Sequence, residues 1–373
     1  HRKQGQFERA ILHYSVAMGK DPMHFKALFN RGFSHDKMGD FDSAIADYTA
    51  ALKLDSSNAF AYYNRGISYD RKGDLKQAIE NFSEAILLEG NNADFFHNRG
   101  FSNRKLGRYR AATEDYTAAL RLNNKHFKAY YNRAFAQDKL GQYAEAVQDY
   151  SHALALEPHN GNALHNRASA QEKLGRNKEA IIDFTSAIEI DGTNASSYNS
   201  RGLVYDKLAK LDKAISDFSK AIRLDASNAI YCHNRGYCYR NKGDFKLACE
   251  DYTRAIELNP WNATAFNNRG YARRKQGLYA EAVVDYSSSL QLQPNNVKSL
   301  NNRGYCYAKL GEFDRALLDY SQVLDLDEYN THALHNRGIS FDKLGQYQKA
   351  VDDLTQALHL DPSNASALFN RGS

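Results

Sequence analysis

The chain repeats itself every 34 residues, and this period restricts the possible folds more than any other feature. The pair Asn-Arg recurs from Asn30-Arg31 to Asn370-Arg371 without insertion or deletion, and only Ser200 interrupts the asparagines. A unit of this length cannot bury its apolar face alone, so neighbouring units must stack on one another. The sequence therefore predicts a solenoid of stacked repeats instead of several independent globular domains.

The register of the repeat predicts the domain organisation. With Asn30 as position 6, residues 1–24 form a partial repeat, residues 25–364 form ten complete repeats, and residues 365–373 form a second partial repeat. Exposed solenoid ends need polar capping helices and neither end carries one, so we expect this chain to be part of a longer protein. The complete repeats are expected at 25–58, 59–92, 93–126, 127–160, 161–194, 195–228, 229–262, 263–296, 297–330 and 331–364.

Departures from the repeat cluster in 161–194 and 195–228. They fall at Ala168, Ser169, Asn177, Ser200 and Ala209. We therefore expect a softer joint here, or a boundary between two ligand surfaces.

Each repeat is expected to form two antiparallel α-helices, which makes the fold all-α. Position 15 is glycine in most repeats, as at Gly39, and glycine ends a helix readily because it adopts the left-handed conformation. Helix A is thus expected at positions 1–14 and helix B at positions 18–30. Position 20 is always alanine, and position 24 is Tyr or Phe except at Leu354. These two positions predict the stripe of helix B that faces helix A.

Composition argues against several classes of function. The 49 Lys and Arg exceed the 44 Asp and Glu by only five, which does not indicate nucleic-acid binding. No apolar stretch is long enough to cross a membrane. Four cysteines in a chain of this length favour a reducing compartment, so we expect an intracellular, cytoplasmic location. Residues that recur in every repeat are architectural whereas a catalytic centre is singular, so we expect no enzymatic activity, no cofactor and no metal site.

The pattern resembles the tetratricopeptide repeat family, whose signature has Gly at position 8, Ala at 20, an aromatic residue at 24 and Pro at 32. All five prolines of this chain fall at position 32. The resemblance implies a right-handed superhelix with helix A lining the concave side and helix B the convex side. Two positions depart from the signature. Trp at position 4 is replaced by Leu, Tyr, Phe or Cys, and Leu at position 7 is replaced by Arg throughout.

The arginine at position 7 needs a partner if it lies where leucine is expected. Position 23 is Asp in nine of the ten complete repeats, with Asn81 as the exception. We expect the arginine stem to pack in the leucine site and the guanidinium to pair with this aspartate, in the same repeat or a neighbouring one. The alternative is a basic ladder for an acidic ligand. The candidate structural ion pairs involve Arg31, Arg65, Arg99, Arg133, Arg167, Asp47, Asp115, Asp149 and Asp183.

Positions 6 and 9 of helix A point away from helix B and are the candidate ligand-binding positions. Position 9 is large and apolar or aromatic in nine of ten repeats. Such a row either contacts a bound peptide or is covered by close packing between successive A helices. Asparagine at position 6 can hold a peptide group, or it can bond neighbouring helices instead. The candidates are Asn30, Asn64, Asn98, Asn132, Asn166, Asn234, Asn268, Asn302, Asn336, Phe33, Phe101, Phe135, Tyr237, Tyr271 and Tyr305.

The asparagine series is similar to the ladder on the concave surface of the O-linked N-acetylglucosamine transferase superhelix. That similarity implies that an extended protein segment is held by its main chain, with the variable residues at positions 2 and 5 supplying selectivity. Position 5 is never Lys, which argues against the carboxylate clamp of another branch of the family. Acids at position 12, each followed by a basic residue, are expected on a solvated rim.

The leading hypothesis is a non-enzymatic scaffold that binds an extended protein segment along the concave groove. Two alternatives stay open. The array could be the substrate-recruiting arm of a larger enzyme such as a glycosyltransferase, or a structural component of a large cytoskeletal assembly. In each case the expected partner is a protein.

Overall fold

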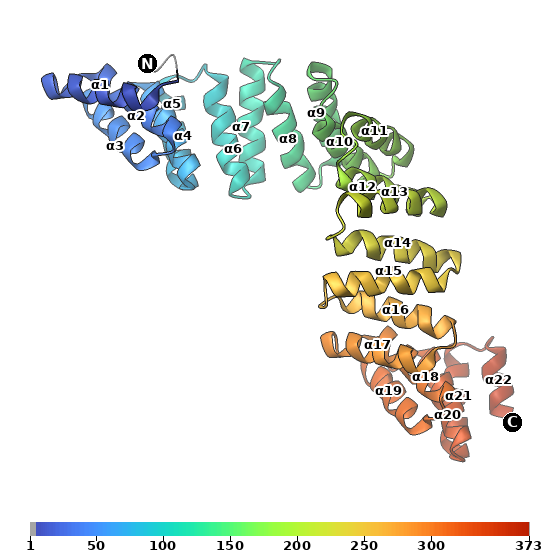
Figure 1. Ribbon diagram of the computed structural model, residues 1–373. Helices are drawn as coiled ribbons and strands as arrows, with labels where there is room; N and C mark the ends of the chain where they lie inside the picture. The colour runs from blue at the N-terminus through green and yellow to red at the C-terminus, as the bar shows by residue number, and fades with distance from the viewer. Residues whose placement is uncertain (1–4, 373) are drawn as a thin grey trace. The chain divides into compact units, whose positions relative to one another are not determined.

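The computed structural model describes residues 5–372, which form 22 α-helices and contain no strand. The predicted all-α solenoid of helix pairs is confirmed (Figure 1). The helices divide into two compact units, with the division between Asp191 and Gly192. This division lies within the stretch of irregular residues that predicted a joint. Each unit is a stack of helix pairs in which every helix packs on the one before it and the one after it.

The first unit contains α1 to α11, and α1 is the B helix of the partial repeat. The bounds are α1 (Phe7–Lys20), α2 (Phe25–Met38), α3 (Phe41–Leu54), α4 (Ala59–Lys72), α5 (Leu75–Leu88), α6 (Ala93–Lys105), α7 (Tyr109–Leu122), α8 (Phe127–Lys139), α9 (Tyr143–Leu156), α10 (Gly161–Lys173) and α11 (Asn177–Ile190). From α2 onward, the even-numbered helices are A helices and the odd-numbered helices are B helices.

The second unit continues the same alternation. Its helices are α12 (Ala195–Lys207), α13 (Leu211–Leu224), α14 (Ala229–Lys242), α15 (Phe245–Leu258), α16 (Ala263–Lys275), α17 (Tyr279–Leu292), α18 (Val297–Lys309), α19 (Phe313–Leu326), α20 (Thr331–Lys343), α21 (Tyr347–Leu360) and α22 (Ala365–Gly372). The start of the chain, residues 1–4, lies outside the described residues, as does Ser373.

Local sequence explains where the A helices begin and end. The asparagine at position 34 caps the N-terminus, and Asn58 Oδ1 accepts a hydrogen bond from the Ala61 backbone N–H at 3.0 Å. Gly39 ends α2 with a φ of 83°. Ala209 takes the place of this glycine after α12 and adopts a φ of 54°, a left-handed conformation that side chains disfavour.

The B helices begin one residue earlier than predicted, at position 17 instead of 18. The residue at position 16 follows the terminating glycine directly and can act as the N-cap. Asp40 does so for α3, where its Oδ1 accepts from the Ser43 backbone N–H at 3.1 Å. Helices α2 and α3 are therefore joined by two residues, the terminating Gly39 and the capping Asp40.

The core of each repeat lies where a large aromatic side chain of helix B meets a small residue of helix A. Tyr116 is completely buried and packs on Gly100, where an added Cβ would lie 3.0 Å from its ring. Ala112 and Ala119 flank Tyr116 on the same face of α7 and are also fully buried. Position 8 is therefore small because the position-24 ring occupies the space beside it.

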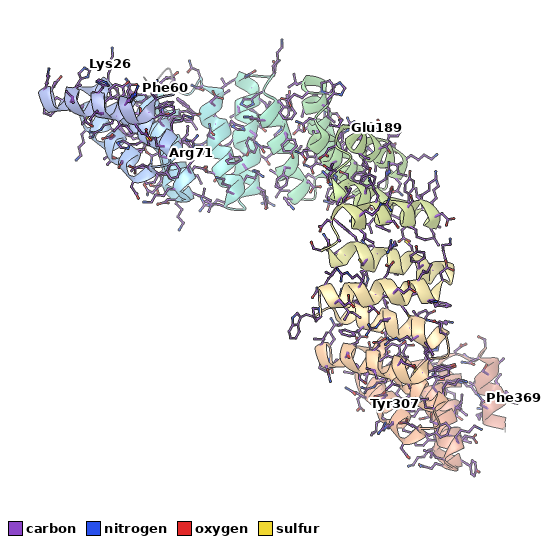
Figure 2. The ribbon with its side chains drawn as sticks, in the orientation of Figure 1. Lys26, Phe60, Arg71, Glu189, Tyr307 and Phe369 are labelled. Carbon is purple, nitrogen blue, oxygen red and sulfur yellow. The ribbon has the colours of Figure 1, made fainter. Side chains whose placement is uncertain are left out.

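Contacts between successive A helices bury a further set of residues that the sequence did not reveal. Ser68 at position 10 is fully buried and donates to Asp36 Oδ1 at 2.9 Å. Arg71, labelled on α4 in Figure 2, donates from Nη1 to the other oxygen of the same carboxylate. The expectation of a solvated rim at position 12 is wrong for Asp36, which is 7% exposed. It is buried because the next A helix packs directly over it.

Candidate functional site

The arginine at position 7 forms a three-way contact in the first unit. Arg133 donates from Nε and Nη2 to the two carboxylate oxygens of Asp149, each at 2.7 Å. Its Nη1 donates to Thr117 Oγ1 in the preceding repeat at 3.0 Å. The same carboxylate contact joins Arg31 to Asp47, Arg99 to Asp115 and Arg167 to Asp183. The structure places the aspartate in the same repeat as its arginine, the point that the sequence left open.

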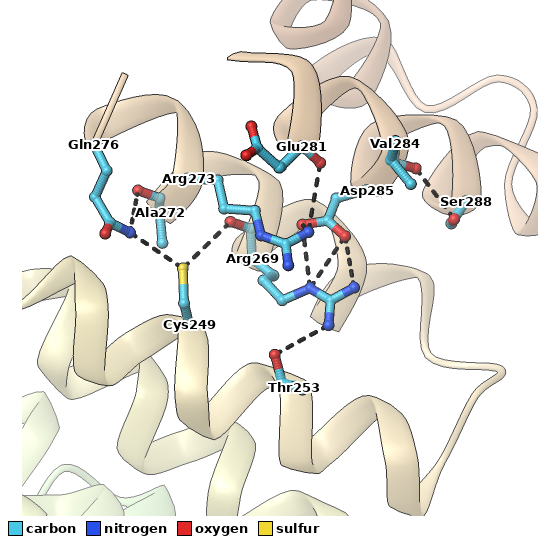
Figure 3. Close-up of polar contacts among 10 residues, drawn as sticks. All are labelled: Cys249, Thr253, Arg269, Ala272, Arg273, Gln276, Glu281, Val284, Asp285 and Ser288. Carbon is cyan, nitrogen blue, oxygen red and sulfur yellow. Dashed lines mark hydrogen bonds and ion pairs between the residues drawn. The ribbon is translucent and has the colours of Figure 1, made fainter. Parts of the chain in front are cut away.

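The contact recurs in the second unit, where Figure 3 shows one example. Arg269 donates from Nη2 to Asp285 at 2.7 Å and from Nη1 to the Thr253 hydroxyl at 3.0 Å. Arg273 donates to the same carboxylate at 2.8 Å, so a fully buried aspartate holds two guanidinium groups. The position-7 arginines are therefore bonded inside the repeat framework instead of being presented to a ligand.

One natural variation tests how strictly the contact needs an acid. Arg65 donates from Nε to Asn81 Oδ1 at 2.7 Å and from Nη1 to Thr49 at 3.0 Å. The amide oxygen thus takes the place of one carboxylate oxygen at Nε, and the contact with the preceding repeat is kept. The hydroxyl at position 25 bonds both within its own helix and to the next repeat. Thr117 donates to the Thr113 carbonyl at 2.7 Å, and it also accepts from Arg133 of the next repeat.

Several asparagines at position 6 bond to the preceding A helix. Asn98 Nδ2 donates to the Tyr63 hydroxyl at 2.7 Å, and Asn166 Nδ2 donates to the Tyr131 hydroxyl at 2.8 Å. In the second unit, Asn234 Nδ2 donates to Asn199 Oδ1 at 2.9 Å. Each of these contacts joins position 6 to position 5 of the repeat before it. The amide nitrogen therefore fixes the stacking of the helices, whereas the amide oxygen forms none of these contacts.

The position-9 side chains are neither fully open to a ligand nor fully covered by the neighbouring A helices. Most of the row is half-buried, and Tyr237 is 37% exposed. In the first unit, Phe101 and Phe135 each lie 4.9 Å from the guanidinium carbon of Arg104. Phe33 lies within 5.1 Å of the Lys37 ammonium group. Basic side chains thus lie over these rings, and Phe33 also packs edge-on against Phe7.

Part of this surface forms a groove of about 920 Å³ in the second unit. It crosses the A helices α14, α16, α18 and α20. Six of the predicted residues line it together: Asn268, Asn302, Asn336, Tyr237, Tyr271 and Tyr305. Asn234 is not among the lining residues. The predicted candidates from Asn30 to Asn166 and from Phe33 to Phe135 lie in the first unit and do not line this groove.

Two lining residues that the sequence analysis did not select are arginines at position 12. Arg240 lies 4.4 Å from the Tyr237 ring centroid and 5.3 Å from that of Tyr271. Arg274 lies 5.2 Å from the Tyr271 centroid and 4.9 Å from that of Tyr305. Three tyrosines and two arginines therefore alternate across α14, α16 and α18. The signal was present in the sequence, because position 12 is acidic in most repeats and changes to Arg here.

The remaining lining of the groove is polar. Asn267, Asn301 and Lys298 line it beside the asparagines of position 6. Burial, assisted by the charge of Arg240, lowers the pKa of His233. His335 on α20 also has a lowered pKa, caused by burial and then by His332. These shifts favour neutral imidazoles, so the positive charge of the groove comes from Arg240, Arg274 and Lys298.

Among residues 5–372, no cluster of His, Cys, Asp and Glu side chains has the arrangement of a metal site. No helix in the same range combines the length and the hydrophobicity that crossing a membrane requires.

The repeated helix pairs define a helical repeat protein, and in the second unit its A helices line a groove. Family models described as tetratricopeptide repeat match residues 59–92, 127–160, 195–228, 297–330 and 332–364, and also 93–126 and 161–194. A related model described as TPR repeat matches 37–73, 236–277 and 270–311. The chain belongs to the tetratricopeptide repeat family.

Solved structures show the same fold. The C-terminal part of a TPR repeat-containing protein from Cytophaga hutchinsonii is 20% identical, with a TM-score of 0.56 over 64% of this chain and 98% of that one. A tetratricopeptide repeat protein from Parabacteroides merdae is 22% identical, with a TM-score of 0.50 over 66% and 98%. YrrB, a TPR protein described as having an unusual peptide-binding site, is 25% identical, with a TM-score of 0.48 over 51% and 98%. A search of curated proteins found no match.

Proposed function

We propose that this chain is a non-enzymatic interaction scaffold that binds an extended protein segment across the A helices of the second unit. The observation that carries the proposal is the groove, where asparagine amides and tyrosine rings face a common open space. Members of this repeat family typically mediate protein–protein interactions, which supports the proposal. The proposal includes two further points. Residues 25–364 form ten complete repeats, and their asparagines form a ladder like that of the glycosyltransferase superhelix.

The asparagine contacts suggest how a peptide would be held. In Asn98, Asn166 and Asn234 the amide nitrogen already donates to the preceding helix. An asparagine held in this way keeps its carbonyl oxygen to accept a hydrogen bond from a peptide N–H. In the groove, Asn268 already accepts from Arg240. This role therefore falls to Asn302 and Asn336. A single side chain would thus fix the helix stacking and hold the bound main chain. The recruiting-arm alternative would use the same surface, whereas an assembly component would use the convex face as well. Both stay predictions.

Selection of phage-displayed peptides on the immobilised chain tests the proposal. The groove variant combines Asn268→Ala, Asn302→Ala and Asn336→Ala. The control variant combines Glu281→Ala and Asp314→Ala, two exposed positions on the B helices. We expect enriched peptides to bind the wild type and the control equally and the groove variant at least tenfold more weakly. Failure to enrich any peptide, or equal binding to all three proteins, would contradict the proposal, provided that circular dichroism shows the variants to be folded.

A further inference from the structure

Three successive A helices of the second unit contain no acidic residue. Helices α14, α16 and α18 carry neither Asp nor Glu, whereas each described A helix of the first unit contains at least one acid. Of the four basic residues of α16, Arg269 and Arg273 bind Asp285, whereas Arg274 lines the groove together with Arg240 and Lys298. The groove that these helices line has no carboxylate among its lining residues. Positive charge is therefore concentrated at the surface proposed to bind a partner.

The two arginines of the groove differ from the arginines of the repeat framework, because no carboxylate neutralises them. Arg240 donates from Nη1 to the amide oxygen of Asn268 at 3.0 Å and forms no ion pair within residues 5–372. Arg274 likewise forms no ion pair in that range, and its Nε is buried without a hydrogen-bond partner. Each framework arginine described above, in contrast, is bonded at its own aspartate or asparagine. Half-buried guanidinium groups without a counter-ion attract an anion.

We infer that the groove of the second unit selects an extended peptide segment rich in acidic side chains, with carboxylates bound by Arg240 and Arg274. This inference rests on the proposed function and names the class of partner. The planar guanidinium fork fits a carboxylate through two parallel hydrogen bonds. Stacking on tyrosine rings holds each fork in place before the peptide arrives, which lowers the entropy lost on binding.

The geometry also sets the spacing of the acids. Both guanidinium carbons lie within 5.3 Å of the Tyr271 ring centroid. An extended chain advances roughly 3.3 Å per residue. Carboxylates two or three residues apart therefore match the two arginines. The amide groups of Asn268, Asn302 and Asn336 lie along the same groove, where they can bond the main chain between the acidic side chains.

A single-stranded nucleic acid is the competing anionic partner, and the tyrosines argue against it. Such ligands bind by stacking bases on exposed aromatic faces. Here Tyr271 lies against both Arg240 and Arg274, and Tyr305 lies against Arg274 and Lys309. Rings already covered by cations offer bases little free face. The asparagine amides also match peptide groups better than they match sugar and phosphate.

Fluorescence anisotropy with defined peptides tests the inference. The probe is a fluorescein-labelled 12-residue peptide with an amidated C-terminus and Glu at every second or third position among Ser and Ala. Matched peptides carry Gln or Lys in place of Glu, and a labelled 12-nucleotide oligo-dT is the nucleic-acid probe. We expect the full chain to bind the Glu peptide at least tenfold more tightly than the Gln peptide, and more weakly as salt rises. Amidation removes the terminal carboxylate, so binding must come from the side chains.

Variants then locate the binding site. The double substitution Arg240→Gln and Arg274→Gln should weaken binding of the Glu peptide at least tenfold. Arg104→Gln is the matched control, because Arg104 occupies the same repeat position and stacks on two aromatic rings in the first unit. It should change the affinity by less than twofold. The comparison of Glu, Gln and Lys peptides uses the wild type alone, so it decides the question even if the double variant fails to fold.

The outcomes separate this inference from the proposed function. Equal affinity for the Glu and Gln peptides, or Glu binding that survives the double substitution in a folded protein, would overturn the inference. If phage selection still yields neutral peptides that depend on the groove asparagines, the proposed function stands without it. Tighter binding of oligo-dT than of any peptide would overturn both.

Discussion

Arg133 donates from Nη1 to the hydroxyl of Thr117 at 3.0 Å, and this bond joins one repeat to the B helix of the repeat before it. The same guanidinium is held by Asp149 within its own repeat. A residue that replaces an apolar family position therefore connects three helices at once. Because equivalent contacts recur in both units, they stabilise the interfaces between repeats as well as the repeats themselves.

Removing the carboxylate should be costly, and replacing it by an amide should not. Asp149→Ala leaves a partly buried guanidinium without its main partner and should lower the free energy of unfolding by about 3 kcal/mol. Asp149→Asn should cost clearly less, because Arg65 already binds Asn81 in this arrangement. Urea denaturation, combined with hydrogen exchange of α8 and α9, measures both effects. Equal costs for the two variants would show that Arg133 does not depend on a hydrogen-bond acceptor here.

The hydroxyl between repeats can be tested separately. Thr117→Val keeps the shape of the side chain but removes the acceptor for Arg133, and should destabilise the chain by about 1 kcal/mol. Thr113→Val is the matched control on the same helix, because the Thr113 hydroxyl donates only to the Tyr109 carbonyl in its own helix. Faster hydrogen exchange in α7 and α8 should follow the first substitution and not the second. The same exchange rates in both variants would argue against a bond that couples repeats.

The turn after α12 offers a stabilising substitution. Ala209 has a φ of 54°, whereas the corresponding Gly243 has a φ of 88°. Ala209→Gly should raise stability by about 1 kcal/mol, because glycine reaches the left-handed region without steric cost. Gly243→Ala should lower stability by a similar amount. Midpoints of thermal or urea unfolding compare the two, and a loss of stability in the Ala209 variant would contradict the explanation.

The buried pair of His97 and Asn132 makes stability depend on pH. Burial, with smaller effects from His126, Lys128 and Arg104, lowers the pKa of His97 to about 4. Neutral Nε2 can accept from Asn132 Nδ2 at 3.2 Å, whereas a protonated ring could not. The unfolded chain takes up this proton near pH 6.5. Stability is therefore unaffected above about pH 6.5 and falls by about 2–3 kcal/mol as the pH drops to about 4.

The substitution His97→Tyr isolates this titration. Tyrosine occurs at the same repeat position in Tyr63, where its hydroxyl accepts from Asn98. The variant keeps an acceptor for Asn132 and loses the titrating ring. Urea unfolding at several pH values between 7 and 4 should give a shallower decline for the variant than for the wild type. Parallel declines would assign the acid sensitivity to other groups.

The architecture could be predicted because it is repeated. Glycine at position 15 indicates a helix end, alanine at position 20 a close contact between helices, and an aromatic residue at position 24 a core side chain. Recurrence in every repeat turns these weak signals into a strong one. Pairing of Arg31 with Asp47 could be anticipated for the same reason, since the acid recurs with the base. The helix B start was one residue off because the cap directly follows the glycine.

The candidate site was predicted only in part. Asn268, Asn302, Asn336 and the three tyrosines were selected by position, and the structure places them in one groove. Arg240 and Arg274 were missed, because position 12 was treated as a solvated rim. The surroundings of position 12 depend on the next A helix. The residues of that helix that bond to position 12 lie 28 to 35 residues further along the sequence.

The sequence by itself determined the helix pairs, their period and the stacking of repeats, because these follow from local propensity and from apolar faces that must be buried. Only the tertiary structure decided which polar groups form hydrogen bonds between helices and which remain available to a partner. Periodicity places a side chain on a helix face, but its hydrogen bonds depend on the distance to a neighbouring helix. For this reason the framework arginines described above are paired with aspartates, Arg65 excepted, whereas Arg240 and Arg274 lie in the groove without a carboxylate partner.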